Sequence, residues 1–162
     1  MAVQDNADLI AGPVQLRQAV TGDVNAIARI ETACFGDPWS VQGIEDALTY
    51  SYSTMLTAVL GGDIVGFACL YQMVDEGEIV QVAVTPKFQG QGIGRQLLGG
   101  LIRHGIEHGV TRFILDVRVS NDRAVKLYEK AGFKKLALQK NFYSQPTEDG
   151  WLMEMLPQAP AL

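Results

Sequence analysis

Residues 89–94 have the sequence QGQGIG, which places three glycines in six positions. They follow the apolar stretch VQVAV and precede RQLLGGLIRHGIEH, whose apolar residues recur at helical spacing. The first amides of a helix have no partner within it, and the helix dipole favours an anion there. Glycines let this backbone approach phosphate oxygens, because no Cβ lies in the way. The segment predicts a phosphate-binding loop or, without a ligand, only a glycine-rich helix entry.

Two common nucleotide-binding patterns do not fit this loop. The P-loop pattern G-x-x-x-x-G-K-[ST] needs a Lys-Ser or Lys-Thr pair, and none follows here. The dinucleotide pattern G-x-G-x-x-G, counted from Gly90, needs a glycine where Arg95 stands. We therefore expect a different phosphate-containing ligand.

A second short pattern, HGIEH at residues 104–108, matches the H-x-x-E-H of one class of zinc peptidases. His104 and His108 are the only histidines of the chain, and Gly109 is expected to end their helix at once. Histidines also suit a helix C-terminus because of the helix dipole. We predict no metal site here.

Alternating and helical periodicities outline the elements that must position these residues. Strands are predicted at residues 14–20, 54–60, 64–74, 78–84, 111–119, 133–139 and 151–156, with a turn at 75–77 and a loop at 141–150. Helices are predicted at residues 21–35, 41–50, 92–108 and 120–131. The order predicts a mixed α/β sheet in a single domain over residues 14–157, with a loose extension at 1–13 and a tail at 158–162.

Composition limits the class of protein. The chain has 162 residues, 48% hydrophobic and 19% charged, which is typical of a globular domain. Its net charge of -5 argues against nucleic acid as a main partner. No apolar run is long enough to span a membrane, and the first basic residue is Arg17, so no signal peptide is expected. Cys34 and Cys69 are interpreted as buried thiols, which indicates a reducing, cytoplasmic location.

The spacing Gln89-x-x-Gly92-x-Gly94 resembles the pyrophosphate loop of the GNAT acyltransferases, which bind acetyl-coenzyme A. The likeness continues in the preceding strand, where that fold lays the pantetheine arm along the backbone, and in VSNDRAVKLYEKAGF at residues 119–133. It implies the GNAT fold, a mostly antiparallel mixed sheet flanked by helices. It implies that coenzyme-binding positions are Val82, Ala83, Val84, Gln89, Gly90, Gln91, Gly92, Ile93, Gly94, Arg95 and Asn121.

Within this superfamily the chain is similar to the RimI group, which acetylates the N-terminal alanine of a small-subunit ribosomal protein. The likeness covers residues 14–157 and rests on DPWS, LDVRVSNDRAVKLYEKAGF, KNFY and LMEMLP besides the glycine loop. It implies acetyl-coenzyme A as cosubstrate, no metal, and a protein with a free N-terminus as acceptor. A different amine acceptor, or a GNAT-fold protein that binds the coenzyme without turnover, are the alternatives.

The resemblance also implies catalytic roles. The group's general base, a glutamate five residues before the Asn, corresponds to Asp116, and its general acid corresponds to Tyr128. Aspartate is one methylene shorter, so we expect it to act through a water on an α-amine whose pKa is near 8. Glu78 is a rival base, because many GNAT enzymes place theirs on this strand.

Each of these residues also has a purely structural interpretation. Asn121 could only cap the helix that follows, Tyr128 could be a core residue, and Asp116 could only bond a backbone amide. Trp39, Phe142 and Tyr143 are expected to line the acceptor channel, or else they only cover the sheet edge.

Overall fold

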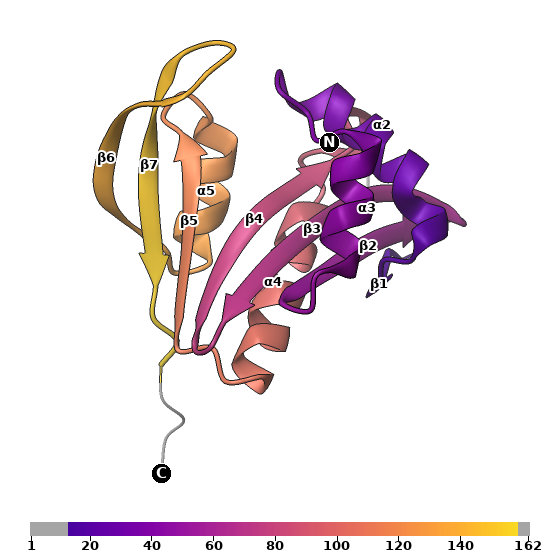
Figure 1. Ribbon diagram of the computed structural model, residues 1–162, viewed down its shortest axis with the longest axis horizontal. Coiled ribbons are helices and arrows are strands. Elements are labelled where there is room, and N and C mark those ends of the chain that lie inside the picture. The colour runs from indigo at the N-terminus through magenta and orange to yellow at the C-terminus, as the bar shows by residue number, and fades with distance from the viewer. Residues whose placement is uncertain (1–12, 159–162) are drawn as a thin grey trace, which may run out of the picture.

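The computed structural model describes residues 13–158, so the predicted extension and tail lie almost wholly outside the described residues. A seven-stranded sheet runs in the order β1-β2-β3-β4-β5-β7-β6 (Figure 1). Its strands are β1 (Gln15–Gln18), β2 (Ser53–Leu60), β3 (Asp63–Met73), β4 (Glu76–Val84), β5 (Arg112–Arg118), β6 (Lys134–Tyr143) and β7 (Glu148–Met155). Every neighbouring pair is antiparallel except β4 and β5.

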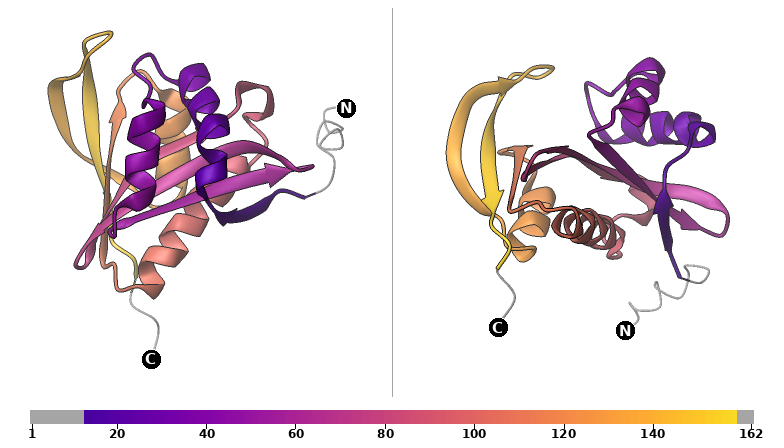
Figure 2. Two further views of the ribbon diagram at one scale, coloured as in Figure 1. Left: turned by 45° about the vertical axis from the view of Figure 1, so that its right-hand side comes forward. Right: turned by 60° about the horizontal axis from the view of Figure 1, so that its bottom comes forward.

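Helices cover both faces of the sheet. They are α2 (Val24–Cys34), α3 (Val41–Thr49), α4 (Ile93–Glu107) and α5 (Asp122–Lys130), with short 3-10 turns η1 (Thr21–Asp23) and η2 (Pro86–Phe88). The helices α2 and α3 lie on one face, and α4 and α5 lie on the other (Figure 2). Within residues 13–158, none of the helices has the length and apolar character that a membrane crossing requires.

The central strand β3 explains this layering, because successive side chains of a strand point to opposite faces. Phe67 and Cys69 are fully buried in the cluster under α2 and α3. Ala68 and Leu70 are buried in the larger cluster that includes the apolar face of α4. A strand buried on both faces reads as a continuous apolar run, as IVGFACL does.

The sheet divides between β4 and β5. These parallel strands pair only from Glu76 to Glu78, opposite Arg112 to Ile114. Beyond this point β4 continues to Val84 with β3 as its described neighbour, while β5 continues to Arg118 beside β7. The two strands diverge visibly in Figure 1. The sheet therefore consists of two wings, β1–β4 and β5–β7–β6, that meet at three residue pairs.

The predicted elements and their order are confirmed, with differences at some ends. The predicted turn at 75–77 was too long, because β4 already begins at Glu76. The predicted loop at 141–150 was wrong, because β6 extends to Tyr143 and β7 begins at Glu148. An irregular register after Gln139, with Asn141 at φ 51°, lets β6 continue through polar residues that were interpreted as loop.

Candidate active site

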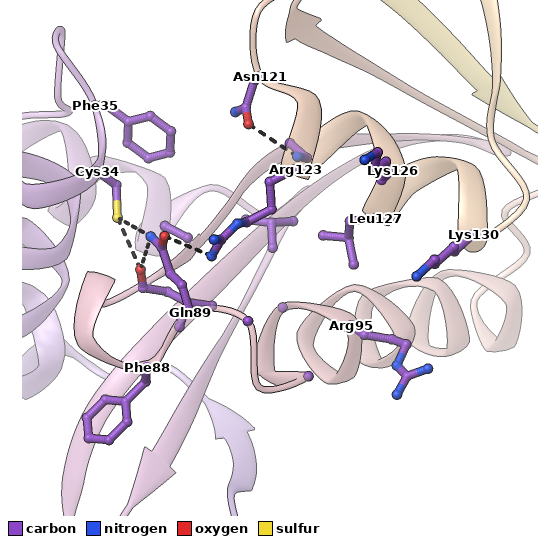
Figure 3. A pocket seen from close by; sticks show the side chains of 17 residues that line it. Cys34, Phe35, Phe88, Gln89, Arg95, Asn121, Arg123, Lys126, Leu127 and Lys130 are labelled. Carbon is purple, nitrogen blue, oxygen red and sulfur yellow. Dashed lines mark hydrogen bonds between the residues drawn. The ribbon is translucent and has the colours of Figure 1, made fainter. Parts of the chain in front are cut away.

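A cavity of about 510 Å³ lies beside the divergence of the two strands, within the size range of small-molecule sites. It is walled by the end of β4, the glycine loop, the start of α4, one face of α5 and the end of α2 (Figure 3). The lining residues are Cys34, Phe35, Val82, Ala83, Val84, Phe88, Gln89, Gly90, Gly92, Gly94, Arg95, Asn121, Arg123, Ala124, Lys126, Leu127 and Lys130.

The glycine loop is shaped by two residues with positive φ. Gly90 has φ +80° and Gly92 has φ +87°, a conformation that disfavours any side chain. The first hydrogen bond of α4 runs from the Gln96 amide to the Gly92 carbonyl, so the preceding amides have no acceptor within the helix. The loop can therefore present amides to an anion at a helix N-terminus.

Gln89 ties the loop to three other segments, as the dashed lines in Figure 3 show. Its amide nitrogen donates to the Val84 carbonyl at 2.9 Å and lies 3.9 Å from the Cys34 sulfur. Its amide oxygen accepts from the Arg123 guanidinium at 3.2 Å. These contacts fix the loop against β4, α2 and α5.

Four cations and no carboxylate line the cavity, although the whole chain has a net charge of -5. Arg123, Lys126 and Lys130 share one face of α5, and Arg95 belongs to the first turn of α4. The three α5 residues were missed from the sequence, yet their spacing of three and four was a usable signal. The donor set fits a ligand with several phosphate groups, such as coenzyme A.

The backbone of β4 provides a second binding feature. From Ile79 to Val84 this strand has no β5 partner, so its edge at the divergence can offer main-chain groups to a ligand. The Val84 carbonyl is an exception, because it already accepts from Gln89. Val82, Ala83 and Val84 line the cavity, as expected. A narrow, amide-containing arm can lie along this edge.

The other expected coenzyme residues divide into two groups. Asn121 lines the cavity and also accepts a hydrogen bond from the Ala124 amide at 3.2 Å, so it is an N-cap as well. Gln91 is exposed and Ile93 is buried in the core, and neither is among the residues that line the cavity. Any contact from these two positions would come from their backbone.

The two candidate bases are neighbours at the point where β4 and β5 separate. Glu78 pairs with Ile114, and Asp116 lies two residues further along β5 on the same face. Burial, and then the charges of Asp116 and Glu76, raise the pKa of Glu78 above its usual value. The Gln139 amide donates to Asp116 at 2.6 Å, which orients that carboxylate.

Tyr143 lies near Asp116, and Tyr128 lies near Tyr143 but is not among the residues that line the cavity. Burial and then the charge of Asp116 raise the pKa of Tyr143 to about 12. Tyr128 is 7% exposed in the α5 core, in edge contact with the Phe133 ring at 5.9 Å. Burial and then Tyr143 raise the pKa of Tyr128, so both hydroxyls are protonated at neutral pH. A protonated hydroxyl can donate a proton to a leaving group.

The expected acceptor-channel residues lie outside the cavity lining. Phe142 is half exposed, and its ring packs edge-on to that of Tyr143. Trp39 is partly buried against the core under α2 and α3. Its backbone amide donates to Glu31 at 2.7 Å. Glu31 is fully buried in α2, and burial raises its pKa to about 7. Trp39 is thus held by a residue that the sequence did not single out.

The interpretation of Cys34 as a buried thiol was wrong. Cys34 is half-buried at the end of α2, where it lines the cavity and lies 3.3 Å from the Val84 carbonyl. Burial, and then the charge of Glu31, raise the pKa of this thiol, which makes it a weak nucleophile at neutral pH. Cys69 is buried, as expected.

The HGIEH segment ends α4, as predicted. The two imidazoles stack at 4.0 Å, His104 Nε2 lies 3.1 Å from the Thr54 hydroxyl, and His108 Nδ1 lies 2.8 Å from the His104 carbonyl. Among residues 13–158, no cluster of three His, Cys, Asp or Glu side chains could hold a metal ion.

Comparisons with known proteins agree with this geometry. The model of the acetyltransferase (GNAT) family matches residues 24–133. The [ribosomal protein bS18]-alanine N-acetyltransferase of Escherichia coli is 36% identical over 80% of this chain and 86% of its own. Its counterpart in Haemophilus influenzae is 35% identical over 77% and 84%.

A solved structure shows the same fold. The crystal structure of the ribosomal-protein alanine N-acetyltransferase from Escherichia coli superimposes with a TM-score of 0.84 at 28% identity, covering 92% of this chain and 97% of the other. The seven-stranded sheet with helices on both faces is the GNAT fold that the sequence predicted. Acetyltransferases of this family use acetyl-coenzyme A. The chain belongs to the GNAT acetyltransferase family and is an acetyl-coenzyme A-dependent N-acetyltransferase.

Proposed function

We propose that this protein transfers the acetyl group of acetyl-coenzyme A to a protein N-terminal amine, the N-terminal alanine of a small-subunit ribosomal protein. The observation that carries the proposal is the divergence of β4 and β5. A phosphate-compatible cavity lies along one side of it, and two carboxylates lie where the strands separate. The choice of acceptor is supported by the 36% identical relative, whose name states that reaction. A cytoplasmic location, expected from the sequence, suits such an acceptor.

The coenzyme is proposed to bind with its diphosphate at the amides of the glycine loop and the α4 N-terminus. Arg95, Arg123, Lys126 and Lys130 would balance its phosphate charges. The pantetheine arm would pair with the open edge of β4 at Val82–Val84. This orientation directs the thioester toward the end of the cavity where β4 meets β5.

Asp116 is proposed as the general base, with Glu78 as the rival on the neighbouring strand. The base removes a proton from the α-ammonium, directly or through a water, and the neutral amine attacks the thioester carbonyl. A backbone amide near Val82 stabilises the oxyanion of the tetrahedral intermediate. That intermediate expels the coenzyme thiolate, which takes a proton from Tyr128, and the nitrogen loses its second proton. This second proton restores the Tyr128 hydroxyl, and the base releases the first proton to solvent. No covalent enzyme intermediate is needed, and the raised pKa of Cys34 is consistent with its having no nucleophilic role.

Mass spectrometry of acetyl transfer to two peptides tests this proposal. One peptide carries the first residues of the small-subunit ribosomal protein with a free alanine amine. The other has the same sequence with a blocked N-terminus and one internal lysine. We expect acetylation of the free N-terminus only, with release of one equivalent of coenzyme A thiol.

The alternatives give different results in the same experiment. Acetylation of the lysine peptide at an equal rate would contradict the preference for an N-terminus. Binding of acetyl-coenzyme A, measured by calorimetry, without acetylation of either peptide would contradict the proposed acceptor. It would favour a different amine or a protein that only binds the coenzyme.

A further inference from the structure

The tip of the β6–β7 hairpin is held by Arg118, at the end of β5. Its guanidinium donates to the Ser144 carbonyl at 3.0 Å and to the Pro146 carbonyl at 2.9 Å. It also lies 3.2 Å from the Glu148 carboxylate and 4.6 Å from the centre of the Tyr143 ring. A single side chain therefore binds both ends of the tip and stacks on a neighbouring aromatic ring.

The residue enclosed by these contacts has an unfavourable backbone conformation. Gln145 lies between the two carbonyls that Arg118 binds, and its φ is +58°, in the left-handed region that side chains disfavour. Such a conformation persists where surrounding contacts determine it. Arg118 supplies these contacts from both sides of Gln145.

Glu148 makes the attachment more rigid. Its carboxylate accepts from the Ser120 amide at 2.8 Å and also pairs with Arg118. Hydrogen bonds from Ser120 and then Arg118 hold the pKa of Glu148 below its usual value. The hairpin is therefore attached to β5 and to the turn that follows it.

The tip reaches across to the connection between α2 and α3. A Cβ built on Gly36 would lie 2.9 Å from the Gln145 carbonyl oxygen, which is too close for a normal contact. A hydrogen bond from the Trp39 amide to the carboxylate of Glu31 on α2 holds the α2–α3 connection in place. The hairpin tip and this connection thus form a backbone bridge between the two wings of the protein.

The bridge is on the face that holds the candidate bases. Arg118 is two residues from Asp116 on β5, so both side chains lie on one face. Glu78 lies on that same face, through its pairing with Ile114. An acceptor that approaches these carboxylates meets the bridge.

We propose that Arg118 is a specificity-determining positioning residue. By holding the β6–β7 tip against Gly36, it lets a chain terminus reach the acceptor end and obstructs an internal lysine. This inference rests on the proposed function. A terminus enters end-on, with its main chain leading away in one direction. An internal lysine brings main chain in two directions, which a closed bridge obstructs. The side chain of Arg118 makes its hydrogen bonds to the hairpin. Its backbone carbonyl accepts from the amide of the cavity residue Asn121, and a substitution at position 118 keeps this carbonyl. Replacing the side chain should therefore act mainly on the acceptor.

The variant Arg118→Gln tests the proposal by steady-state kinetics. It should raise the KM for the N-terminal peptide about tenfold or more, because it removes charge-assisted hydrogen bonds that hold the tip. It should also raise the ratio of lysine to N-terminal acetylation and leave the KM for acetyl-coenzyme A within about twofold. Arg118→Lys should give a peptide KM and a lysine-to-N-terminal ratio between those of the unaltered protein and Arg118→Gln. The reason is that an ammonium group cannot bind both carbonyls in the same planar geometry.

A second variant disturbs the bridge at the α2–α3 connection. Gly36→Ala places a methyl group against the Gln145 carbonyl and should reproduce the change in selectivity while Arg118 stays intact. Gly22→Ala is the matched control, because a Cβ there has no neighbour within 4 Å. Arg112→Gln is the control for charge, because Arg112 forms its ion pairs with Glu76 and Glu154 at the far end of the same strand.

Hydrogen–deuterium exchange tests the role of Arg118 independently of the proposed function, because the experiment needs no acceptor substrate. In Arg118→Gln, amides of residues 143–148 and 36–40 should exchange faster, with residues 82–95 unchanged. Unchanged exchange, or kinetics that match those of Arg112→Gln, would overturn the role of Arg118 even if the N-terminal peptide is acetylated. A third outcome is faster exchange in Arg118→Gln while the unaltered protein fails to acetylate the N-terminal peptide. This result would overturn the proposed acceptor, and with it the role of Arg118 in selectivity.

Discussion

The cavity beside the glycine loop and the acceptor end are built in different ways. Most of the cavity lining comes from two short stretches, residues 82–95 and 121–130. The proposed acceptor end instead combines Glu78 of β4, Asp116 of β5 and Tyr143 of β6 with a bridge between two loops. The cavity offers a ligand mainly backbone amides and positive charge. The acceptor end relies on side chains whose positions depend on several distant elements.

This difference explains why the acceptor can change during evolution of the fold while the coenzyme stays the same. Backbone amides and a helix N-terminus suit any coenzyme A thioester, so they identify a family without identifying an acceptor. The acceptor end can change through loop substitutions that leave the cavity intact. Perturbations of the two regions should therefore have separable effects on the two substrates.

The largest effect is expected at the acceptor end from Asp116→Asn. We expect kcat/KM for the peptide to fall about 100-fold at pH 7, which is typical for loss of a general base. The loss should shrink at pH 9, because an α-amine with pKa near 8 is then already neutral. Initial rates at both pH values measure it, and the KM for acetyl-coenzyme A should not change.

The matched control for Asp116 is Glu76→Gln, which removes another carboxylate that influences Glu78. A larger loss in Glu78→Gln than in Asp116→Asn would reassign the base to β4. A loss of equal size at pH 7 and pH 9 would indicate that Asp116 positions groups instead of accepting a proton.

A second prediction concerns Glu31, which lies between the two regions, near both Trp39 and Cys34. Its pKa of about 7 is raised from 4.5, so the folded state favours the protonated form. Its stabilising contribution is complete below pH 4.5 and is lost as pH rises through about 7. Glu31→Gln should therefore be more stable than the unaltered protein by about 3 kcal/mol at pH 8 and equally stable near pH 4.5.

Urea unfolding of both proteins at these two pH values measures the difference. The amide keeps an oxygen for the Trp39 backbone, so the connection from α2 to α3 should stay in place. Glu129→Gln, at an exposed position of α5, is the control for a surface glutamate. A variant that is destabilised at every pH would mean that the ionised carboxylate stabilises this region.

A smaller effect is expected in the cavity from Arg123→Ala. Removing one of four cations should raise the KM for acetyl-coenzyme A about fivefold at low salt, and less at high salt, because surface charge interactions are screened. The KM for the peptide should stay constant. Lys135→Ala, which removes a cation stacked on Trp151 outside the cavity, is the control. An equal rise for both substrates would contradict the separation.

The smallest effect is expected from Asn121, which has a structural and a proposed binding role. Asn121→Ala should lower stability by about 1 kcal/mol through loss of the α5 cap. Asn121→Ser keeps the capping oxygen and should restore stability. If serine also restores the KM for acetyl-coenzyme A, capping alone explains the residue, and a KM that stays raised supports contact with the coenzyme.

The same difference determined what the sequence could predict. The order of strands and helices followed from local periodicity, and the glycine loop from six consecutive residues. The basic face of α5 was equally local and could have been found from the spacing of Arg123, Lys126 and Lys130. Arg118 could not, because its four partners lie about thirty residues away in a hairpin that was expected to be a loop. Glu31 was missed, and Cys34 was wrongly interpreted as buried, because burial is a property of the packed molecule.

The short pairing of β4 with β5 has a mechanical consequence. The two wings share the larger apolar core, but β4 and β5 pair at only three residue pairs, so β4 has an interior edge that water must solvate when no ligand is present. In the proposed binding mode, the coenzyme arm would occupy this edge like an added strand and connect both wings. The cosubstrate would then also be a structural component, and its departure after each turnover would loosen the fold between β4 and β5. Saturating coenzyme A should raise the melting temperature by mass action, with the largest gain in amide protection along β4.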